Sequence, residues 1–418
     1  MTDPVIIGDA TLINADVITG LQSLADDSVD CVVTSPPYWG LRDYGVEGMI
    51  GLEPTFAEYL TKMVAVFEEV KRVLKPTGTC WVNMGDAYAQ GGGKRRADED
   101  IGYYKAKEQE YIATGRAANM PASWDERGDR AANTAQGSFK PKDLLLMPAR
   151  VAIALQDAGW WVRSEIIWAK PNPMPESVTD RPTSAHEKIY LLTKRGTYFY
   201  DADAVREPVQ EPWRSGNHEG GRDRPDDDLM TGRPRAFGWQ ERAYNPSGRN
   251  LRNVWTIATQ PYPEAHFATF PEELPRKCIM AGTSERGVCY ACGKPWERVV
   301  EKTGGPPKGR HSNKPDYHRT QYQDAHPEGN STGGGLSHQY AKYGYPETKT
   351  LGWQPTCPCV DTPTIPATVL DPFSGSGTTG LVALKLDRLY IGIELNPTYI
   401  NLSIKRLEME ARQQKLFV

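Results

Sequence analysis

The stretch Thr368-Val-Leu-Asp-Pro-Phe-Ser-Gly-Ser-Gly-Thr-Thr-Gly380 carries most of the information about the fold of this chain. An apolar run ends in an acid, and Gly375, Gly377 and Gly380 follow with G-x-G-x-x-G spacing where a helix is expected to begin. A second apolar run then ends at Glu394. This order of strand, glycine turn, helix, strand and acid predicts a nucleotide-like ligand at the end of a parallel sheet.

The residues of this loop bear on the ligand. Glycines let a ligand approach the backbone closely, and Glu394 offers acceptors for the two hydroxyls of a ribose. Asp371 at the end of the strand would repel a pyrophosphate but would suit the sulfonium and ammonium charges of S-adenosylmethionine. The pattern alone leaves a dinucleotide, S-adenosylmethionine and a turn without any ligand as alternatives.

Apolar runs and amphipathic stretches alternate along the rest of the chain. One expected helix, Phe56–Leu74, has a predicted buried stripe of Leu60, Val64, Phe67, Val70 and Leu74. The alternation predicts an α/β fold, a Rossmann-like, doubly wound and mostly parallel sheet with helices on both faces. The other expected helices are Leu144–Ala158, 378–386 and Tyr399–Gln413, and the expected strands are Val29–Thr34, Thr79–Met84, Val162–Trp168, Lys188–Thr193, 368–370 and 389–393.

A second informative segment, Val33-Thr-Ser-Pro-Pro-Tyr38, follows the strand expected at Val29–Thr34. Proline has no N–H, so its carbonyl is an acceptor without a competing donor. Ser35 Oγ and the Pro36 carbonyl can orient the hydrogens of an amino group on a flat ring, and Tyr38 can stack on that ring. This suits a base extruded from a duplex. The alternative is a Pro-Pro turn with Tyr38 in the core.

The chemistry of this segment favours nitrogen as the methyl acceptor. Methylation of cytosine at carbon 5 needs a thiolate that adds to the ring, and the segment contains no cysteine. Cys31 and Cys80 lie within expected core strands, where cysteine behaves as a small hydrophobic residue. We therefore expect direct transfer of a methyl group to an exocyclic nitrogen.

The two motifs together resemble the β-class DNA amino-methyltransferases, in which the catalytic motif precedes the cofactor motif. Further similar stretches are Gly8-Asp9, Val73–Gly78, Trp168–Asn172, Ala185–Tyr190, Ala265–Pro271 and Tyr390–Asn396. The resemblance implies a circularly permuted motif order and a target amine held by Ser35, Pro36, Pro37 and Tyr38. It also implies a cofactor pocket lined by Asp9, Asp371, Pro372, Phe373, Ser374, Gly375, Ser376, Gly377, Thr378, Glu394 and Asn396.

Serine at the first position of the catalytic motif resembles enzymes that act on cytosine N4, whereas enzymes that act on adenine N6 more often have aspartate there. Adenine N6 remains the alternative substrate. An NAD-dependent Rossmann oxidoreductase and a catalytically inactive DNA-binding module are remote alternatives. The resemblance implies double-stranded DNA as partner and a bacterial, archaeal or phage-encoded cytoplasmic enzyme. It allows a homodimer and leaves a cognate restriction enzyme unknown.

Three polar stretches, Gly91–Lys140, Arg206–Arg252 and Gly282–Pro366, are too long for ordinary connections and are interpreted as insertions. With the resemblance, they divide the chain into consecutive parts. These are the catalytic half at 1–90 and 141–205, a polar insertion at 91–140, a target-recognition insertion at 206–252, a segment covering the cofactor at 253–281, a zinc-knuckle-like insertion at 282–366 and the cofactor-binding half at 367–418.

Four of the seven cysteines form two close pairs, Cys289-x-x-Cys292 and Cys357-x-Cys359. Four thiolates would form a closed structural zinc site, which methyl transfer to an amine does not need for its chemistry. Two unrelated turns with free thiols are the alternative. The histidines between the pairs are expected in exposed loops or in contact with phosphate, with replacement of a cysteine ligand as an alternative: His311, His318, His326 and His338.

The charge distribution bears on the partner. A formal net charge of -4 excludes a uniformly basic coat but permits a basic cleft. Arginines interleaved with aromatic residues in Arg206–Arg252 are expected to contact DNA, and Lys94-Arg-Arg96 begins a second candidate arm. No apolar run of membrane-spanning length occurs, and the first residues do not resemble a signal peptide, so no membrane association is expected.

Overall fold

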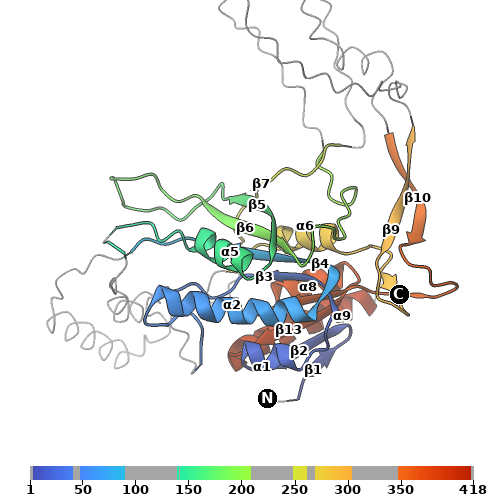
Figure 1. Cartoon of the computed structure of the whole chain (residues 1–418), viewed down its shortest axis with the longest axis horizontal. Coiled ribbons are helices and arrows are strands. Elements are labelled where there is room, and N and C mark those ends of the chain that lie inside the picture. Colours follow the sequence, from blue (N-terminus) through green and yellow to red (C-terminus); the bar gives the residue numbers. More distant parts are fainter. Residues whose placement is uncertain are drawn as a thin grey trace, which may run out of the picture. The chain divides into compact units, whose positions relative to one another are not determined.

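The computed structural model describes residues 3–40, 48–89, 139–140, 142–208, 248–260, 269–303 and 347–415 (Figure 1). The chain forms two compact units. The first comprises residues 1–201, 252–297 and 355–418, and it carries the large sheet and every motif residue discussed below. The second comprises residues 202–251 and 298–354, and within it the Arg298 guanidinium lies 4.5 Å from the centre of the Trp353 ring.

The first unit is built on a nine-stranded sheet with the order β1-β2-β13-β12-β3-β4-β6-β5-β7 (Figure 1). Strands β2, β13, β12, β3 and β4 are parallel to one another, and β6 is antiparallel to both of its neighbours. The mostly parallel sheet is therefore confirmed. Its strands are β1 (Val5–Ile7), β2 (Ala10–Asn14), β3 (Val29–Thr34), β4 (Leu74–Met84), β5 (Trp161–Ala169), β6 (His186–Thr193), β7 (Val254–Thr256), β12 (Thr368–Asp371) and β13 (Leu389–Glu394).

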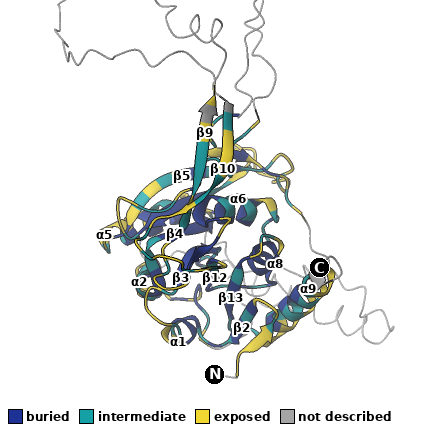
Figure 2. Ribbon diagram, turned by 90° about the vertical axis from the view of Figure 1, so that its right-hand side faces the viewer, coloured by how far each residue is buried: buried dark blue, intermediate teal, exposed yellow. Residues whose placement is uncertain are grey.

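Helices cover both faces of the sheet, as the alternating pattern predicts. Figure 2 shows α1 (Val17–Gln22), α2 (Phe56–Val73) and α5 (Met147–Asp157) on one face. The other face carries α6 (Glu273–Gly282), α8 (Thr378–Lys385) and α9 (Pro397–Lys415). No helix among the described residues combines the length and apolarity that crossing a bilayer requires.

Helix α2 shows how the sequence specifies one layer. Thr55 caps its first turn, where Thr55 Oγ1 accepts a hydrogen bond of 3.3 Å from the Glu58 N–H. The predicted stripe is wrong at Leu60 and Val64, which are only partly buried. The buried face is instead centred on aromatic and long side chains one position earlier, because these fill the space between the sheet and α5. The buried residues of α2 are Phe56, Tyr59, Met63, Val66, Phe67, Val70 and Val73.

The expected cysteine-containing insertion has secondary structure of its own. Strand β8 (Val288–Cys289) pairs with β11 (Thr364–Ile365) in antiparallel orientation. Strands β9 (Trp296–Thr303) and β10 (Glu347–Pro355) form a separate two-stranded sheet. The residues between β9 and β10, which include His311, His318, His326 and His338, lie outside the described residues.

Candidate functional site

The two sequence motifs meet at the carboxyl ends of neighbouring strands. Strands β3 and β12 are adjacent and parallel, with Val32 opposite Leu370. Thr34 therefore ends beside Asp371, and its hydroxyl donates a 2.7 Å hydrogen bond to Asp371 Oδ1. The catalytic motif and the glycine loop leave the same edge of the sheet, where ligands bind in open α/β sheets.

Asp371 joins the motifs rather than facing solvent. The side chain is 1% exposed, and Oδ2 accepts a 2.8 Å hydrogen bond from the Thr379 hydroxyl. Burial raises the pKa of Asp371 to about 6, against the lowering effect of the hydrogen bonds from Thr34, Thr379 and the Phe373 N–H. The carboxylate is thus charged at neutral pH and lies directly behind the glycine loop.

The glycine loop takes the left-handed backbone that its sequence predicts. Gly375 has φ +52° and Gly377 has φ +76°, conformations that favour glycine, and Gly377 is the N-cap of α8. A Cβ on Gly377 would lie 2.9 Å from Ser403 Oγ, so helix α9 packs directly against the loop. A Cβ on Gly380 would overlap the ring of Tyr390. These close approaches leave room only for glycine.

Several predicted cofactor residues shape the loop with buried side chains. Ser374 Oγ lies 2.8 Å from the Tyr390 hydroxyl. One guanidinium nitrogen of Arg406 donates to the Ser376 carbonyl at 3.0 Å, to Ser376 Oγ at 3.1 Å and to Thr378 Oγ1 at 3.0 Å. Neither Ser403 nor Arg406 was predicted. The sequence feature that could have identified them is their i, i+3 spacing, which places two polar residues on one face of α9, the helix that follows the strand ending at Glu394.

Glu394 lies at the end of β13 and faces the glycine loop. Its carboxylate accepts 2.8 Å hydrogen bonds from the Gly375 N–H and the Asn396 N–H. Burial raises the pKa of Glu394, and these backbone hydrogen bonds oppose the shift. Phe373, Gly375, Glu394 and Asn396 are the predicted cofactor residues that are partly exposed, so a ligand can reach them.

Asp9 lies away from this group. It is exposed in the turn before β2, at the amino end of that strand. In the parallel pair of β2 and β13, Ala10 is opposite Tyr390, whereas Glu394 is opposite Asn14. The structure therefore brings Asn14 to the loop, where its side-chain amide donates 2.8 Å and 3.0 Å hydrogen bonds to the Glu394 and Leu395 carbonyls.

Hydrogen bonds hold the backbone of the Pro-Pro-Tyr segment and of the turn that follows it. The Tyr59 hydroxyl donates to the Pro37 carbonyl at 2.9 Å, and the Gly40 N–H donates to the Gly51 carbonyl at 2.8 Å. Ser35 and Tyr38 are partly exposed, and their hydroxyl oxygens are 3.3 Å apart. The hydroxyl groups of the predicted serine and tyrosine thus face one another, and both side chains are accessible to solvent.

A carboxylate that sequence reasoning missed stands behind Tyr38. The Tyr38 hydroxyl donates to Glu187 Oε2 at 3.3 Å, and Asn83 Nδ2 donates to the same oxygen at 2.8 Å. Lys170 forms an ion pair with Glu187 Oε1. Glu187 and Lys170 lie in Ala185–Tyr190 and Trp168–Asn172, two stretches of the family resemblance to which no role had been given.

The four paired cysteines come together in the first unit. The sulfur atoms of Cys289, Cys292, Cys357 and Cys359 all lie within 4.8 Å of one another. Gly293, directly after the first pair, has φ +68°, the left-handed backbone expected for the turn. The cysteines expected in the core, Cys31 and Cys80, are both fully buried.

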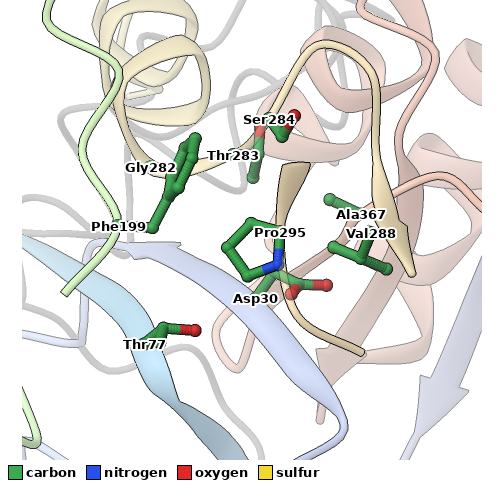
Figure 3. Close-up of a pocket in the computed structure, with 9 residues that line it drawn as sticks. All are labelled: Asp30, Thr77, Phe199, Gly282, Thr283, Ser284, Val288, Pro295 and Ala367. Atoms are coloured by element: carbon green, nitrogen blue, oxygen red, sulfur yellow. The ribbon is translucent and has the colours of Figure 1, made fainter. Parts of the chain in front are cut away.

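A small cavity near this region cannot hold a substrate (Figure 3). It measures about 10 Å³, hardly enough for one water molecule. Asp30 and Ala367, which line it, lie at the amino ends of β3 and β12, the edge opposite the motifs. Ser284 Oγ, also in its lining, has no hydrogen-bond partner among the described residues. The cavity is therefore a packing feature of the interior.

Much of the expected DNA-contacting sequence lies outside the described residues. This holds for Lys94-Arg-Arg96 and for the arginines between residues 209 and 247. The ends of the second segment are held together, because Glu207 and Arg249 exchange backbone hydrogen bonds of 2.9 Å and 2.8 Å. Their side chains form an ion pair of 2.9 Å. Within the segment 253–281 that is expected to cover the cofactor, α6 begins at Glu273, and residues 261–268 are likewise not described.

Comparison with known proteins bears on both motifs. A family model described as DNA methylase matches residues 29–290 and 364–405. The type II methyltransferase M.Cfr9I of Citrobacter freundii is 35% identical over 409 residues, which cover 98% of this chain and 91% of that protein. M.XycI of Xanthomonas campestris pv. cyanopsidis is 36% identical over 406 residues, covering 97% and 90%. A solved structure, PvuII DNA methyltransferase (cytosine-N4-specific), aligns with a TM-score of 0.49 and 16% identity, covering 97% of this chain and 91% of that one.

Proposed function

Because this chain belongs to the DNA methylase family of amino-directed N4 and N6 methyltransferases, we propose that it methylates the exocyclic N4 of cytosine in double-stranded DNA, with S-adenosylmethionine as methyl donor. The observation that carries the proposal is the 2.7 Å hydrogen bond between Thr34 and Asp371. It holds the amino-group motif beside the glycine loop, as transfer from cofactor to amine requires.

The residues of the loop suit S-adenosylmethionine. The left-handed glycines let a ligand approach the backbone, and Glu394 can accept from the ribose hydroxyls. The charged Asp371 behind the loop favours a cationic ligand over a pyrophosphate. When bound, the cofactor supplies an electrophilic methyl group on a sulfonium. The family membership overturns the alternative of an NAD-dependent oxidoreductase.

The catalytic motif is proposed to hold and orient the target amine. Ser35 Oγ and the Pro36 carbonyl accept its two hydrogens, which turns the nitrogen lone pair out of conjugation with the ring. Tyr38 supplies an aromatic surface beside these acceptors. A base within a duplex cannot place its amine between these groups, so the target base has to be flipped out.

The product separates the proposal from its nearest alternative. We expect DNA from a methyltransferase-free host that expresses this chain to contain N4-methylcytosine, because serine at the first position of the catalytic motif resembles enzymes that act on cytosine N4. Mass spectrometry of the digested nucleosides measures this directly. Detection of N6-methyladenine alone would show that adenine N6, rather than cytosine N4, is the methyl acceptor. Absence of both modified bases would favour the inactive DNA-binding module.

The biological setting of this reaction is proposed from the relatives. Their names describe them as type II methyltransferases, so we propose a role in the modification half of a restriction–modification pair. The segment 206–252 is proposed to read the target sequence, on the basis of its arginine and aromatic content. A cognate restriction enzyme and a homodimer remain predictions.

We further propose that the four clustered cysteines bind one structural zinc ion. In a tetrahedral site with Zn–S bonds of about 2.3 Å, the sulfur atoms lie about 3.8 Å apart. The cluster, with all sulfurs within 4.8 Å, needs only a small contraction to reach that geometry. The ion would join the turn 289–293 to residues 357–359 and close the long segment between them. This position is remote from the motif residues, in keeping with a structural role.

Zinc content tests this assignment. Purified protein is expected to contain about one zinc ion per chain by inductively coupled plasma mass spectrometry. Cys292→Ser should lose the ion and unfold at a lower temperature, because closure of the segment then depends on the remaining protein contacts, such as the Thr356 hydroxyl with the Pro295 carbonyl. Cys80→Ala is the matched control, since Cys80 is a buried free cysteine outside the cluster. A wild-type protein with less than about 0.1 zinc per chain would refute the site.

A further inference from the structure

A chain of polar groups leads from Ser35 into the protein. Ser35 Oγ lies 3.3 Å from the Tyr38 hydroxyl, which lies 3.3 Å from Glu187 Oε2. These contacts are at the long end for hydroxyl hydrogen bonds, as catalytic hydrogen bonds often are before substrate binds. Glu187 is the second residue of β6, next to the carboxyl end of β4, and is therefore at the same sheet edge as the motif.

Glu187 is held from two further sides. Lys170, directly after β5, forms an ion pair with Oε1, and both side chains are less than one fifth exposed. Asn83 on β4 donates to Oε2 at 2.8 Å. A Cβ on Gly85 would lie 3.1 Å from the Tyr38 ring and 3.5 Å from Glu187 Cδ, so the backbone there lets the tyrosine and the carboxylate approach.

The carboxylate determines the direction of the hydroxyl chain. An ionised carboxylate only accepts hydrogen bonds, so Tyr38 has to be the donor to Glu187. Burial, followed by the charge of Glu187, raises the pKa of Tyr38, which keeps its proton in place. The Ser35 hydroxyl then donates to the Tyr38 oxygen. The lone pairs of Ser35 Oγ are left to accept from a target amine.

We propose that Glu187 is a positioning residue for Ser35 and the terminal acceptor of the proton that the methylated amine releases. The inference rests on the proposed amino-methyltransferase function. The amine lone pair forms the N–C bond to the methyl group, and the S–C bond breaks with its electron pair remaining on sulfur. One N–H proton passes to Ser35 Oγ, the Ser35 proton passes to Tyr38, and the Tyr38 proton passes to Glu187. Solvent then takes the proton from Glu187.

A buried acceptor supports a ligand-facing role for this network. The Asn83 side chain is 3% exposed, and its Nδ2 has to face the carboxylate, which only accepts. Its Oδ1 consequently has no partner among the described residues. Buried polar atoms are rarely left unpaired, and functional sites are one place where this occurs. The network also explains how a motif with serine in place of aspartate obtains a negative charge near the amine.

Kinetics of the full-length enzyme test the proposal. Glu187→Gln is expected to reduce the single-turnover methyl-transfer rate on DNA by about 10- to 100-fold. The dissociation constants for S-adenosylmethionine and DNA should change by less than about 2-fold. Glu165→Gln is the matched control, because Glu165 also accepts from a tyrosine, Tyr190 at 3.3 Å, and pairs with a lysine, Lys188. The control should keep the wild-type rate.

A double-mutant cycle separates the relay from a structural role. Tyr38→Phe removes only the hydroxyl and retains the ring and the Lys170–Glu187 ion pair. This variant therefore tests the relay even if Glu187→Gln fails to fold. Its rate should fall as in Glu187→Gln, and the double variant should show no further loss, since both changes interrupt one chain. Losses that multiply, or Glu187→Gln within 2-fold of the wild-type rate, would overturn the relay. An inactive wild-type enzyme would instead refute the proposed function.

Discussion

Replacing Ser35 with alanine is expected to abolish measurable methyl transfer, a loss of about 10²- to 10⁴-fold. Ser35 Oγ is the side-chain acceptor proposed for the target amine, and it is the outer end of the hydroxyl chain through Tyr38. Without it, the amine loses an acceptor and the proton loses its path. Incorporation of tritiated methyl groups into unmethylated DNA measures the rate.

Cofactor binding should be unaffected by this change. Thr34, not Ser35, forms the hydrogen bond to Asp371 behind the glycine loop, and the partner of the Ser35 hydroxyl is Tyr38. The dissociation constant for S-adenosylmethionine is therefore expected to stay within about 2-fold of wild type. Ser28→Ala is the control, because Ser28 lies just before the amino end of β3 and its hydroxyl donates to the Ala25 carbonyl. Near-full activity of Ser35→Ala would refute the role of Ser35.

Replacing Asp371 with asparagine is expected to change stability and cofactor affinity in opposite directions. Burial raises the pKa of Asp371 from 3.8 to about 6, so between about pH 4 and pH 6 the folded chain holds a proton that the unfolded chain has lost. The stability from this proton is complete below about pH 4 and is lost as the pH rises to about 6. The shift corresponds to about 3 kcal/mol.

Asparagine is neutral and avoids this loss. Its side chain can also be accommodated, because the Thr379 hydroxyl has the Val33 carbonyl as a second acceptor at 3.4 Å. The free energy of unfolding of Asp371→Asn, relative to wild type, should therefore rise by up to about 3 kcal/mol between pH 4 and pH 7. Urea unfolding at a series of pH values measures the difference. A difference that is independent of pH would show that Asp371 does not titrate as inferred.

The same substitution removes the negative charge behind the glycine loop. Affinity for S-adenosylmethionine should fall by about 10- to 100-fold, since each tenfold loss corresponds to about 1.4 kcal/mol and the attraction between two unit charges at an effective dielectric constant of about 20 is of this order. Affinity for S-adenosylhomocysteine, which lacks the sulfonium charge, should fall less. Isothermal titration with both ligands measures this contrast. Equal losses for the two ligands would show that Asp371 acts through the shape of the loop alone.

Local patterns predicted much of the fold and of the candidate site. Strand β3 begins and ends at the predicted residues, and α2 ends one residue early, because turn residues and apolar periodicity mark such boundaries. Strand β4 begins at Leu74 rather than at the predicted Thr79, since Leu74 pairs with Val29 of β3, and an irregularity in the register separates this pair from Thr79 opposite Cys31. Pairing with a neighbour in the sheet is not visible in a local pattern.

The roles of individual side chains were harder to predict than their positions. Ser374, Ser376 and Thr378 were expected to line a pocket, but their hydroxyls bind Tyr390 and Arg406. Asp9 stands in a stretch typical of the family, yet it lies at the amino end of its strand. In each case the direction of the side chain depends on helix α9 or on the neighbouring strand, and the motif does not specify these.

Residue types at short spacing specify the two motifs and the paired cysteines, and their positions along the chain specify the motif order. The same residue types show that the catalytic motif contains no nucleophilic cysteine. The folded chain adds the hydrogen bond between Thr34 and Asp371, the cluster of four sulfur atoms and the group of Glu187, Lys170 and Asn83 behind Tyr38. These contacts join residues far apart in the chain. The order of strands in the sheet determines which of these residues meet, and that order results from the packing of the whole domain.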